Sequence, residues 1–176
     1  MYRLNHVLLS GLLVGLVGCA SNPPDYDFIA TFDSGQILPD ASNFETPTGR
    51  SAFILNEVTV GTEKRKAIVT LAGAKLAFSI PSVPRDARLT FNAGMGVDRG
   101  DGAEGVITIE ADGRSEVVYR KFLNPVERIE DRRWFEESVS LSKFAGKQIK
   151  IIFSTNAGAK GDAIFDWFAW ADPRLQ

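Results

Sequence analysis

The sequence predicts an all-β fold, an antiparallel β-sandwich of the jelly-roll kind. Its short segments rich in Val, Ile and Phe alternate between apolar and polar residues, and Gly, Pro, Asn and Asp separate them. The 176 residues show no internal repeat and no amphipathic helix longer than two turns. We therefore expect residues 28–176 to form a single β-sandwich domain with one hydrophobic core.

The predicted strands are short segments with alternating apolar residues or brief apolar runs: 27–32, 52–60, 66–71, 75–80, 88–93, 105–110, 115–119, 136–141, 148–154 and 163–170. In the fourth segment Leu76, Phe78 and Ile80 share one face, and Pro81 ends the strand. The dipeptide Asp112-Gly113 predicts a type I′ hairpin turn between the sixth and seventh segments.

The connections and the last strand complete the predicted sandwich. Segment 37–49 carries two prolines and is expected to be an irregular loop, and segment 141–146 a single helical turn. Segment 163–170 is apolar on both faces, which predicts a central strand. Asp166 within it is expected to be a hydrogen-bonded structural carboxylate.

Residues 1–18 have the features of an export signal. Arg3 precedes an apolar run of eleven residues, from Val7 to Val17, that only Ser10 interrupts. Such a run is typical of a signal peptide and is too short for a transmembrane helix, which needs about 20 apolar residues. We expect this segment to direct export and then to be removed.

Cys19 is predicted to be a lipid-attachment site. The segment LVGC that ends there resembles the lipobox of bacterial lipoproteins, in which the cysteine is acylated and becomes the first mature residue. An ordinary signal peptide is the alternative, and it would leave a free thiol in an oxidising compartment. Residues 19–27 are then a lipidated tether, whose reach is at most about 25–30 Å.

The lipobox resemblance implies a lipid-anchored protein of the bacterial cell envelope, with the membrane as one partner. Ala20 follows the cysteine, which in a Gram-negative cell resembles the sorting pattern of the outer membrane, on its periplasmic or surface face. Without the leader the net charge is −3, too mild to predict nucleic-acid binding.

Three blocks in the second half of the chain resemble a known family. They are Leu89–Gly113, Trp134–Phe153 and Gly161–Leu175, the last containing the Asp166-Trp167 pair. In order and spacing they resemble the galactose-binding-like β-sandwich, and within it the novel putative carbohydrate-binding modules attached to many glycoside hydrolases. This resemblance covers roughly residues 75–175 and implies a jelly roll that binds sugars. Phe165 departs from those modules, which often carry a His there.

The segment from Gly94 to Gly105 is the predicted ligand loop. It holds five glycines in twelve residues, together with the charged side chains of Asp98, Arg99, Asp101 and Glu104. Asp98, Asp101 and Glu104 carry the oxygen ligands that Ca²⁺ prefers. Asp101 and Arg99 can instead form directional hydrogen bonds with sugar hydroxyls. A flexible, hydrated loop without a ligand is the alternative.

A sugar ring also needs an exposed aromatic face on which to stack. Trp134 follows two arginines near the start of a strand and is the candidate for that face. Trp167 and Trp170 lie three apart on one strand, so they point to opposite faces and at least one belongs to the core. The alternative is that all three are packing residues.

The composition argues against catalysis. The single His and the single Cys are His6 and Cys19, so the mature domain contains no Ser-His-Asp triad, histidine base or zinc site. No motif in the sequence identifies a pair of Asp or Glu residues as the two carboxylates that glycoside hydrolysis needs. We expect a non-catalytic glycan-binding module at the cell envelope, and the alternative is an envelope scaffold lipoprotein that binds a protein and no sugar.

Overall fold

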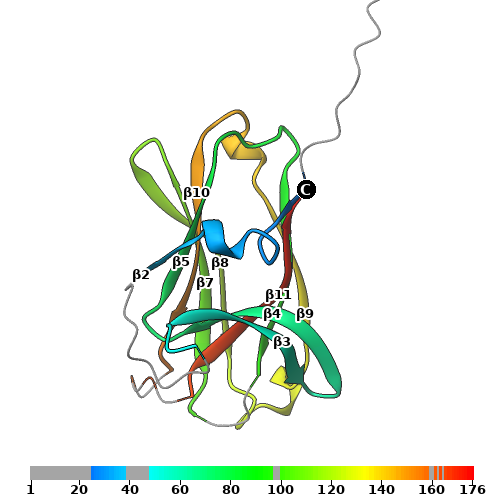
Figure 1. Ribbon diagram of the computed structural model, residues 1–176. Coiled ribbons are helices and arrows are strands. Elements are labelled where there is room, and N and C mark those ends of the chain that lie inside the picture. Colours follow the sequence, from blue (N-terminus) through cyan, green and yellow to red (C-terminus); the bar gives the residue numbers. More distant parts are fainter. Residues whose placement is uncertain (1–24, 39–47, 97–99, 159–160, 162, 164) are drawn as a thin grey trace, which may run out of the picture.

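The computed structural model describes residues 25–38, 48–96, 100–158, 161, 163 and 165–176. Within these ranges the chain forms eleven strands, three 3-10 turns and no longer helix, so the all-β prediction is confirmed (Figure 1). No helix among the described residues is long and apolar enough to cross a membrane. The predicted lipid site, Cys19, and the leader lie outside the described residues.

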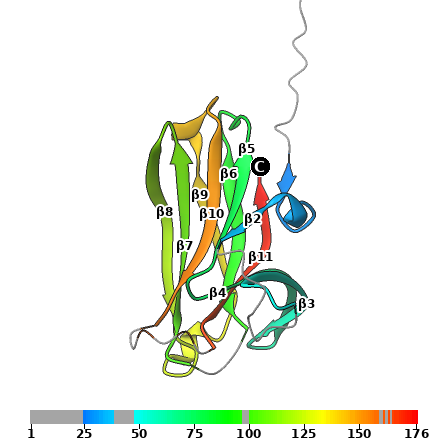
Figure 2. The ribbon, with the colours of Figure 1, turned by 60° about the vertical axis from the view of Figure 1, so that its left-hand side comes forward.

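Two antiparallel sheets pack face to face (Figure 2). Sheet A has six strands: β3 (Ala52–Val60), β4 (Glu63–Leu71), β11 (Trp167–Leu175), β6 (Arg88–Met95) and β9 (Phe135–Ser140) in that order, with β1 (Tyr26–Asp27) also paired to β11. Sheet B has five: β2 (Gln36–Leu38), β5 (Lys75–Ile80), β10 (Ile149–Asn156), β7 (Ala103–Ala111) and β8 (Arg114–Leu123). The 3-10 turns are η1 (Phe32–Ser34), η2 (Ile129–Asp131) and η3 (Ser142–Phe144).

The main core lies between the sheets and is rich in aromatic rings. Trp170 is fully buried and meets Phe153 at 5.3 Å and Phe91 at 5.6 Å between ring centroids, both edge-on. The predicted inward faces of 75–80, 88–93 and 148–154 all belong to this core. The prediction that β11 is central is also confirmed, because β4 and β6 both pair with it.

Three buried polar side chains connect the sheets through this core. The Trp170 indole N–H donates to Thr70 Oγ1 at 2.9 Å. The hydroxyls of Thr70 and Thr155 lie 2.6 Å apart, and Thr155 Oγ1 donates to the Thr70 carbonyl at 3.1 Å. Each donor therefore has an acceptor, so burial of these groups carries no unpaired hydrogen bond.

A second, smaller core lies on the outer face of sheet A. The β3–β4 hairpin curls across that face (Figure 2), with a register shift between Leu55 and Val58. Val58 and Val60 then pack against β11 and Trp134 instead of facing solvent. At the hairpin tip Gly61, with φ of 61°, lies against the carbonyl of Arg132, where a Cβ would sit 2.3 Å from the oxygen.

Several predicted boundaries were wrong at the ends of the chain. Of the first predicted strand, 27–32, Asp27 is in a strand and the rest is a turn that leads into η1. The Asp27 carboxylate accepts hydrogen bonds from the backbone N–H of Ile29 and Ala30 and turns the chain. A strand, β2, lies in the segment predicted to be irregular. The last strand begins at Trp167 and continues to Leu175.

The two predicted turns, at Asp112-Gly113 and at 141–146, are both present in the structure. Asp112 and Gly113 both have positive φ, 52° and 71°, as a type I′ turn requires, and they join β7 to β8. Gly146 has φ of 75° after the predicted helical turn, which is η3. These local signals are specified by residues adjacent in the chain.

Candidate ligand-binding groove

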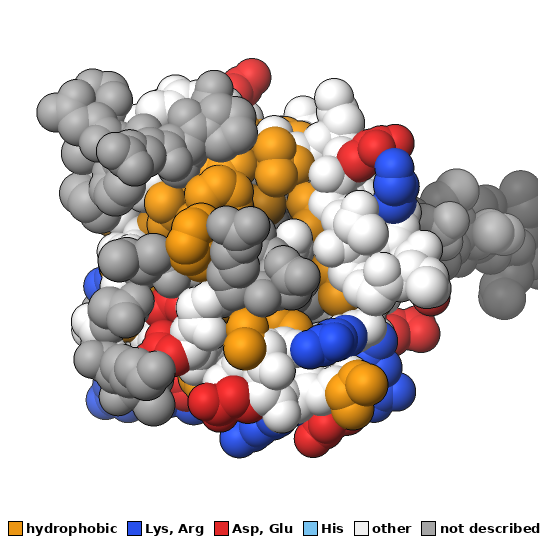
Figure 3. Space-filling view, turned by 90° about the horizontal axis from the view of Figure 1, so that it is seen from below, with side chains coloured by type: hydrophobic (Ala, Val, Ile, Leu, Met, Phe, Trp, Pro, Cys, Tyr) orange, Lys and Arg blue, Asp and Glu red, His pale blue; other side chains and the backbone are white. Residues whose placement is uncertain are grey.

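The two ends of the sandwich carry different connections. The loop end holds the β6–β7 and β10–β11 connections and η2, and it lies at the bottom of Figure 1. The terminal end holds β1, the C-terminus and the tip of the β7–β8 hairpin. Hydrophobic side chains gather on the surface of the loop end (Figure 3).

The predicted ligand loop is shorter than expected. β6 continues to Met95 and β7 begins at Ala103, so Gly94 and Gly105 are strand residues. A Cβ on Gly105 would lie 2.4 Å from the Phe168 ring, and a Cβ on Gly94 would lie 2.8 Å from Trp134. These two glycines make room for aromatic rings, which the prediction of a flexible loop did not anticipate.

Two of the four charged residues of that loop, Asp98 and Arg99, lie outside the described residues. Asp101 is buried at the loop end, and its carbonyl accepts a hydrogen bond from Asn124 Nδ2 at 3.0 Å. Its carboxylate lies beside Gly158, where a Cβ would sit 2.4 Å from Asp101 Oδ1. Gly158 N in turn donates to Asp166 Oδ2 at 2.9 Å, so the prediction of a hydrogen-bonded Asp166 is confirmed.

Glu104 and Trp134 lie on opposite outer faces of the sandwich. Glu104 points outward from sheet B, where Arg120 contacts it at 3.2 Å and Asn156 Nδ2 donates to it at 2.8 Å. Trp134 packs on Gly94 at the outer face of sheet A. No three His, Cys, Asp or Glu side chains come together as a metal site in the described parts of the chain, and calcium at Asp98, Asp101 and Glu104 stays a prediction.

The three tryptophans have three different environments. Trp170 is in the main core. Trp134 is half-buried, its Nε1 donates to the Glu63 carbonyl at 3.4 Å, and the Arg65 guanidinium lies 6.0 Å from its ring. Trp167 is half-buried in the second core and meets Phe53 edge-on at 5.8 Å. Trp134 and Trp167 thus keep part of their surface in solvent.

A groove at the loop end runs beside the curled β3–β4 hairpin. Its first part, the apolar hollow, has a volume of about 210 Å³ and is lined by Leu55, Glu57, Val58, Thr59, Val69, Gly96, Trp167 and Ala169. Its second part, the arginine hollow, has about 340 Å³ and is lined by Thr59, Val60, Gly61, Met95, Gly96, Pro125 and Arg132. The two hollows share Thr59 and Gly96, so they adjoin at these residues, and together we call them the groove.

The groove adjoins two of the predicted features. Gly96, which lines both hollows, is the first residue of the β6–β7 connection. Trp134 lies just behind the arginine hollow, because Gly94 brings its ring and the Val60 side chain together. Of the predicted site residues that the structure describes, Trp134 is therefore brought to the edge of the groove, and Glu104 is not.

Phe165 lies two residues before the start of β11, the strand whose first residue, Trp167, lines the apolar hollow. It is 40 % exposed and has φ of 62°, which is uncommon for an aromatic residue. The Trp167 N–H donates to its carbonyl at 3.0 Å, which turns the chain tightly into β11. The position at which the resembled modules often carry a His is thus occupied here by a solvent-exposed ring.

Sequence reasoning missed the groove because its walls come from five segments that are distant in the sequence. The strands β3, β4 and β11, the end of β6 and the segment around η2 meet only in the folded chain. One signal was present directly after the predicted strand 88–93: Gly94 and Gly96 continue its alternation, so both point to the same face and leave it open to a covering element.

Comparison with known proteins supports the fold and leaves the function open. No family model matches the chain. An uncharacterized protein of Archaeoglobus fulgidus is 32 % identical over 129 residues, and the chain spans about 30 % of that protein's length.

Solved carbohydrate-binding modules share the fold. TmCBM61, in complex with beta-1,4-galactotriose, has a TM-score of 0.55 at 13 % identity, covering 85 % of this chain and 93 % of that one. CBM51 from Clostridium perfringens GH95, in complex with methyl-galactose, has a TM-score of 0.50 at 16 % identity, covering 81 % and 88 %. The K2 cleaved adhesin domain of Lys-gingipain has a TM-score of 0.54 at 11 % identity, covering 87 % and 99 %. The chain therefore has the jelly-roll fold that these domains share.

Proposed function

We propose that the protein is a non-catalytic glycan-binding module held at the bacterial cell envelope. The observation that carries this proposal is the groove at the loop end, with Trp167 in its apolar hollow and Arg132 in the other. The fold is shared with modules whose structures contain methyl-galactose or beta-1,4-galactotriose. A groove with an aromatic wall and a few polar groups suits a sugar, which has both an apolar face and hydroxyls.

The lining of the groove argues for binding without hydrolysis. Glycoside hydrolysis needs two carboxyl groups roughly 5–9.5 Å apart. Among the described residues that line the groove, Glu57 carries the one carboxylate, and Lys64 contacts it at 2.9 Å. The described lining of the groove thus offers hydrogen-bond partners to a sugar, and it does not contain the two carboxyl groups that cleavage of a glycosidic bond needs.

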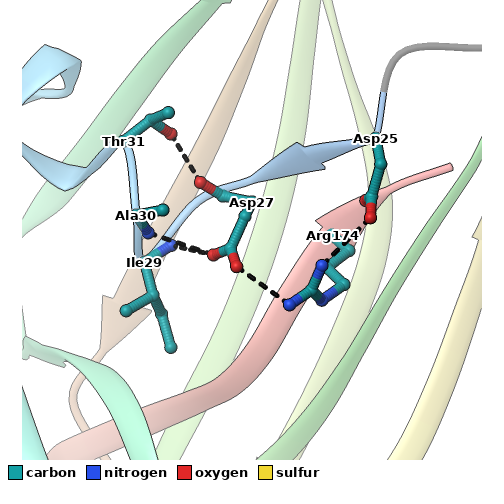
Figure 4. A network of polar contacts seen from close by, with 6 residues as sticks. All are labelled: Asp25, Asp27, Ile29, Ala30, Thr31 and Arg174. Carbon is teal, nitrogen blue, oxygen red and sulfur yellow. Dashed lines mark hydrogen bonds and ion pairs between the residues drawn. The ribbon is translucent and has the colours of Figure 1, made fainter.

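The position of the N-terminal segment supports a tethered module that faces outward. Asp25 and Asp27 both contact Arg174 of β11, which holds the start of the described chain at the terminal end (Figure 4). β6 runs from Arg88, bonded there to Gln176, to Met95 at the groove, a span on the order of 23 Å. With a lipid on Cys19, the groove would face away from the membrane surface.

The binding proposal is tested with the full chain on a glycan array and by titration calorimetry. We expect binding that Trp167→Ala removes and Trp167→Phe largely retains, because a phenyl ring keeps an aromatic wall. Val117→Ala, an exposed apolar residue on sheet B, is the control and should bind as the wild type. Glu104→Gln and Trp134→Ala test the residues predicted from sequence, and calcium is added and chelated in parallel. No binding of the folded protein to any envelope glycan would contradict the proposal.

The anchor has a separate test. Mass spectrometry of the protein from bacterial membranes should show acyl chains on Cys19, and Cys19→Ser should release the protein from the membrane fraction. A stable anchor needs two or more chains, because one acyl chain binds only marginally. An unmodified Cys19 in the mature protein would contradict lipidation without touching the glycan proposal.

A further inference from the structure

We propose that the groove selects acidic glycans, with the carboxylate of one sugar on Arg132 and an uncharged neighbouring sugar in the apolar hollow. This inference rests on the proposed function and names the substrate class of the same site. It follows from how Arg132 is held, from what surrounds it and from the contrast between the two hollows.

Arg132 is fixed in place by contacts on its side chain and its backbone. Its Nε donates to the Pro125 carbonyl at 2.6 Å, and its backbone N–H donates to the Ile129 carbonyl at 3.1 Å. The hairpin tip at Gly61 covers its carbonyl so closely that only a hydrogen atom fits between them. One edge of the guanidinium is therefore pre-oriented, which lowers the entropy lost when a ligand binds.

The remaining donors of Arg132 are available to a ligand. Among the described residues no carboxylate lies within ion-pair distance of it, whereas Arg65, Arg120 and Arg174 each contact one. The described residues that line the arginine hollow include no Asp or Glu. A planar guanidinium with free Nη donors matches a carboxylate by two parallel hydrogen bonds.

The neighbouring hollow has the opposite chemistry. Trp167, Val58 and Val69 make its walls mostly apolar, and its one acid, Glu57, already contacts Lys64. Because the hollows adjoin at Thr59 and Gly96, a ligand that fills both must carry an anionic group next to an apolar face. Two linked sugars, one of them a uronic or similar acid, meet that requirement.

The net charge of the chain does not favour acidic glycans, so a preference for them must come from the groove itself. The formal net charge is −2, so the protein does not attract polyanions by its overall field. A preference for acidic glycans would then depend on the single guanidinium of Arg132. It should weaken as salt rises, because a partly exposed ion pair is screened.

The test compares an oligosaccharide that links a uronic acid to a neutral sugar with the same oligosaccharide after reduction of its carboxyl group, by calorimetry on the full chain. We expect the acid form to bind about tenfold more tightly, equal to about 1.4 kcal/mol. Arg132→Gln should remove that difference. Arg133→Gln is the matched control, since Arg133 stacks on Phe135 at 4.6 Å and does not line the groove, and it should keep the difference.

Equal binding of the acid and reduced forms by the wild type would overturn the inference while leaving the glycan proposal intact. So would an unchanged preference in Arg132→Gln. The wild-type comparison needs no variant, so it decides the question even if Arg132→Gln fails to fold. Absence of binding to every glycan would overturn the proposed function, and this inference with it.

Discussion

Arg174, in the last strand, donates from Nη2 to Oδ2 of Asp27, at the end of the first, at 2.9 Å. A second donation from Nη1 reaches Asp25 at 3.0 Å (Figure 4). Asp27 Oδ1 also accepts the backbone N–H groups of Ile29 and Ala30. One carboxylate therefore both turns the chain and joins the first strand, β1, to the last, β11.

This geometry predicts unequal roles for the two acids. Asp27→Ala should lower the free energy of unfolding by about 1–2 kcal/mol, because it removes a turn-capping acceptor as well as the ion pair. Asp25→Ala should change it by less than about 0.5 kcal/mol, because an exposed pair alone contributes little. Urea unfolding of both variants checks this, and equal losses would show that the cap contributes nothing.

The hydrogen bonds between Trp170, Thr70 and Thr155 predict a buried polar contribution to stability. Thr70→Val keeps the shape of the side chain and leaves the indole N–H without its acceptor. We expect a loss of about 1–3 kcal/mol in the free energy of unfolding. Thr62→Val, at an exposed hairpin position, is the control and should stay within about 0.5 kcal/mol. A neutral Thr70→Val would mean that the network is not formed.

The contact between Gly94 and Trp134 predicts a coupled pair. Gly94→Ala places a Cβ 2.8 Å from the indole ring and 3.1 Å from Val60, and overpacking of this kind destabilises by about 1–3 kcal/mol. In a Trp134→Ala background the same substitution should destabilise less, since the ring is gone. Additive losses in a double-mutant cycle, measured by urea unfolding, would contradict the contact.

The sequence predicted those parts of the fold that neighbouring residues specify. Alternation at Leu89, Phe91 and Ala93 identified an inward face, and Asp112-Gly113 identified a hairpin, because side-chain period and turn chemistry are local. The curl of β3 over sheet A was not predicted. It depends on a register shift and on contacts with Trp134, about eighty residues further on, and neither has a local signature.

The site was less predictable for the same reason. The glycines were noticed and interpreted as loop flexibility, whereas Gly94 and Gly105 admit aromatic rings at strand positions. Trp134 was the candidate for an exposed aromatic face. In the structure it is half-buried and also packs against the β3–β4 hairpin, which forms one wall of the groove. Arg132 was not among the predicted site residues, because nothing near it in sequence indicates that Pro125 and Gly61 orient it.

Tyr119 predicts how stability depends on alkaline pH. Its ring meets Phe91 edge-on at 4.9 Å, and its hydroxyl donates to Glu137 Oε1 at 3.3 Å. Burial, reinforced by the negative charge of Glu137, raises the pKa of Tyr119 well above its ordinary value of 10. Below pH 10 the folded and unfolded chains both hold this proton, so its contribution to stability is complete.

Above pH 10 the unfolded chain releases the proton and the folded chain keeps it, so stability should fall. The expected slope is on the order of 1.4 kcal/mol per pH unit from this group. Tyr119→Phe cannot ionise, so its urea midpoint should fall less steeply than that of the wild type between pH 10 and 11. Val117→Ala, at an exposed residue of the same strand that has no ionisable group, is the control and should keep the wild-type slope. Identical slopes for Tyr119→Phe and the wild type would show that Tyr119 ionises in the folded chain as readily as in the unfolded one.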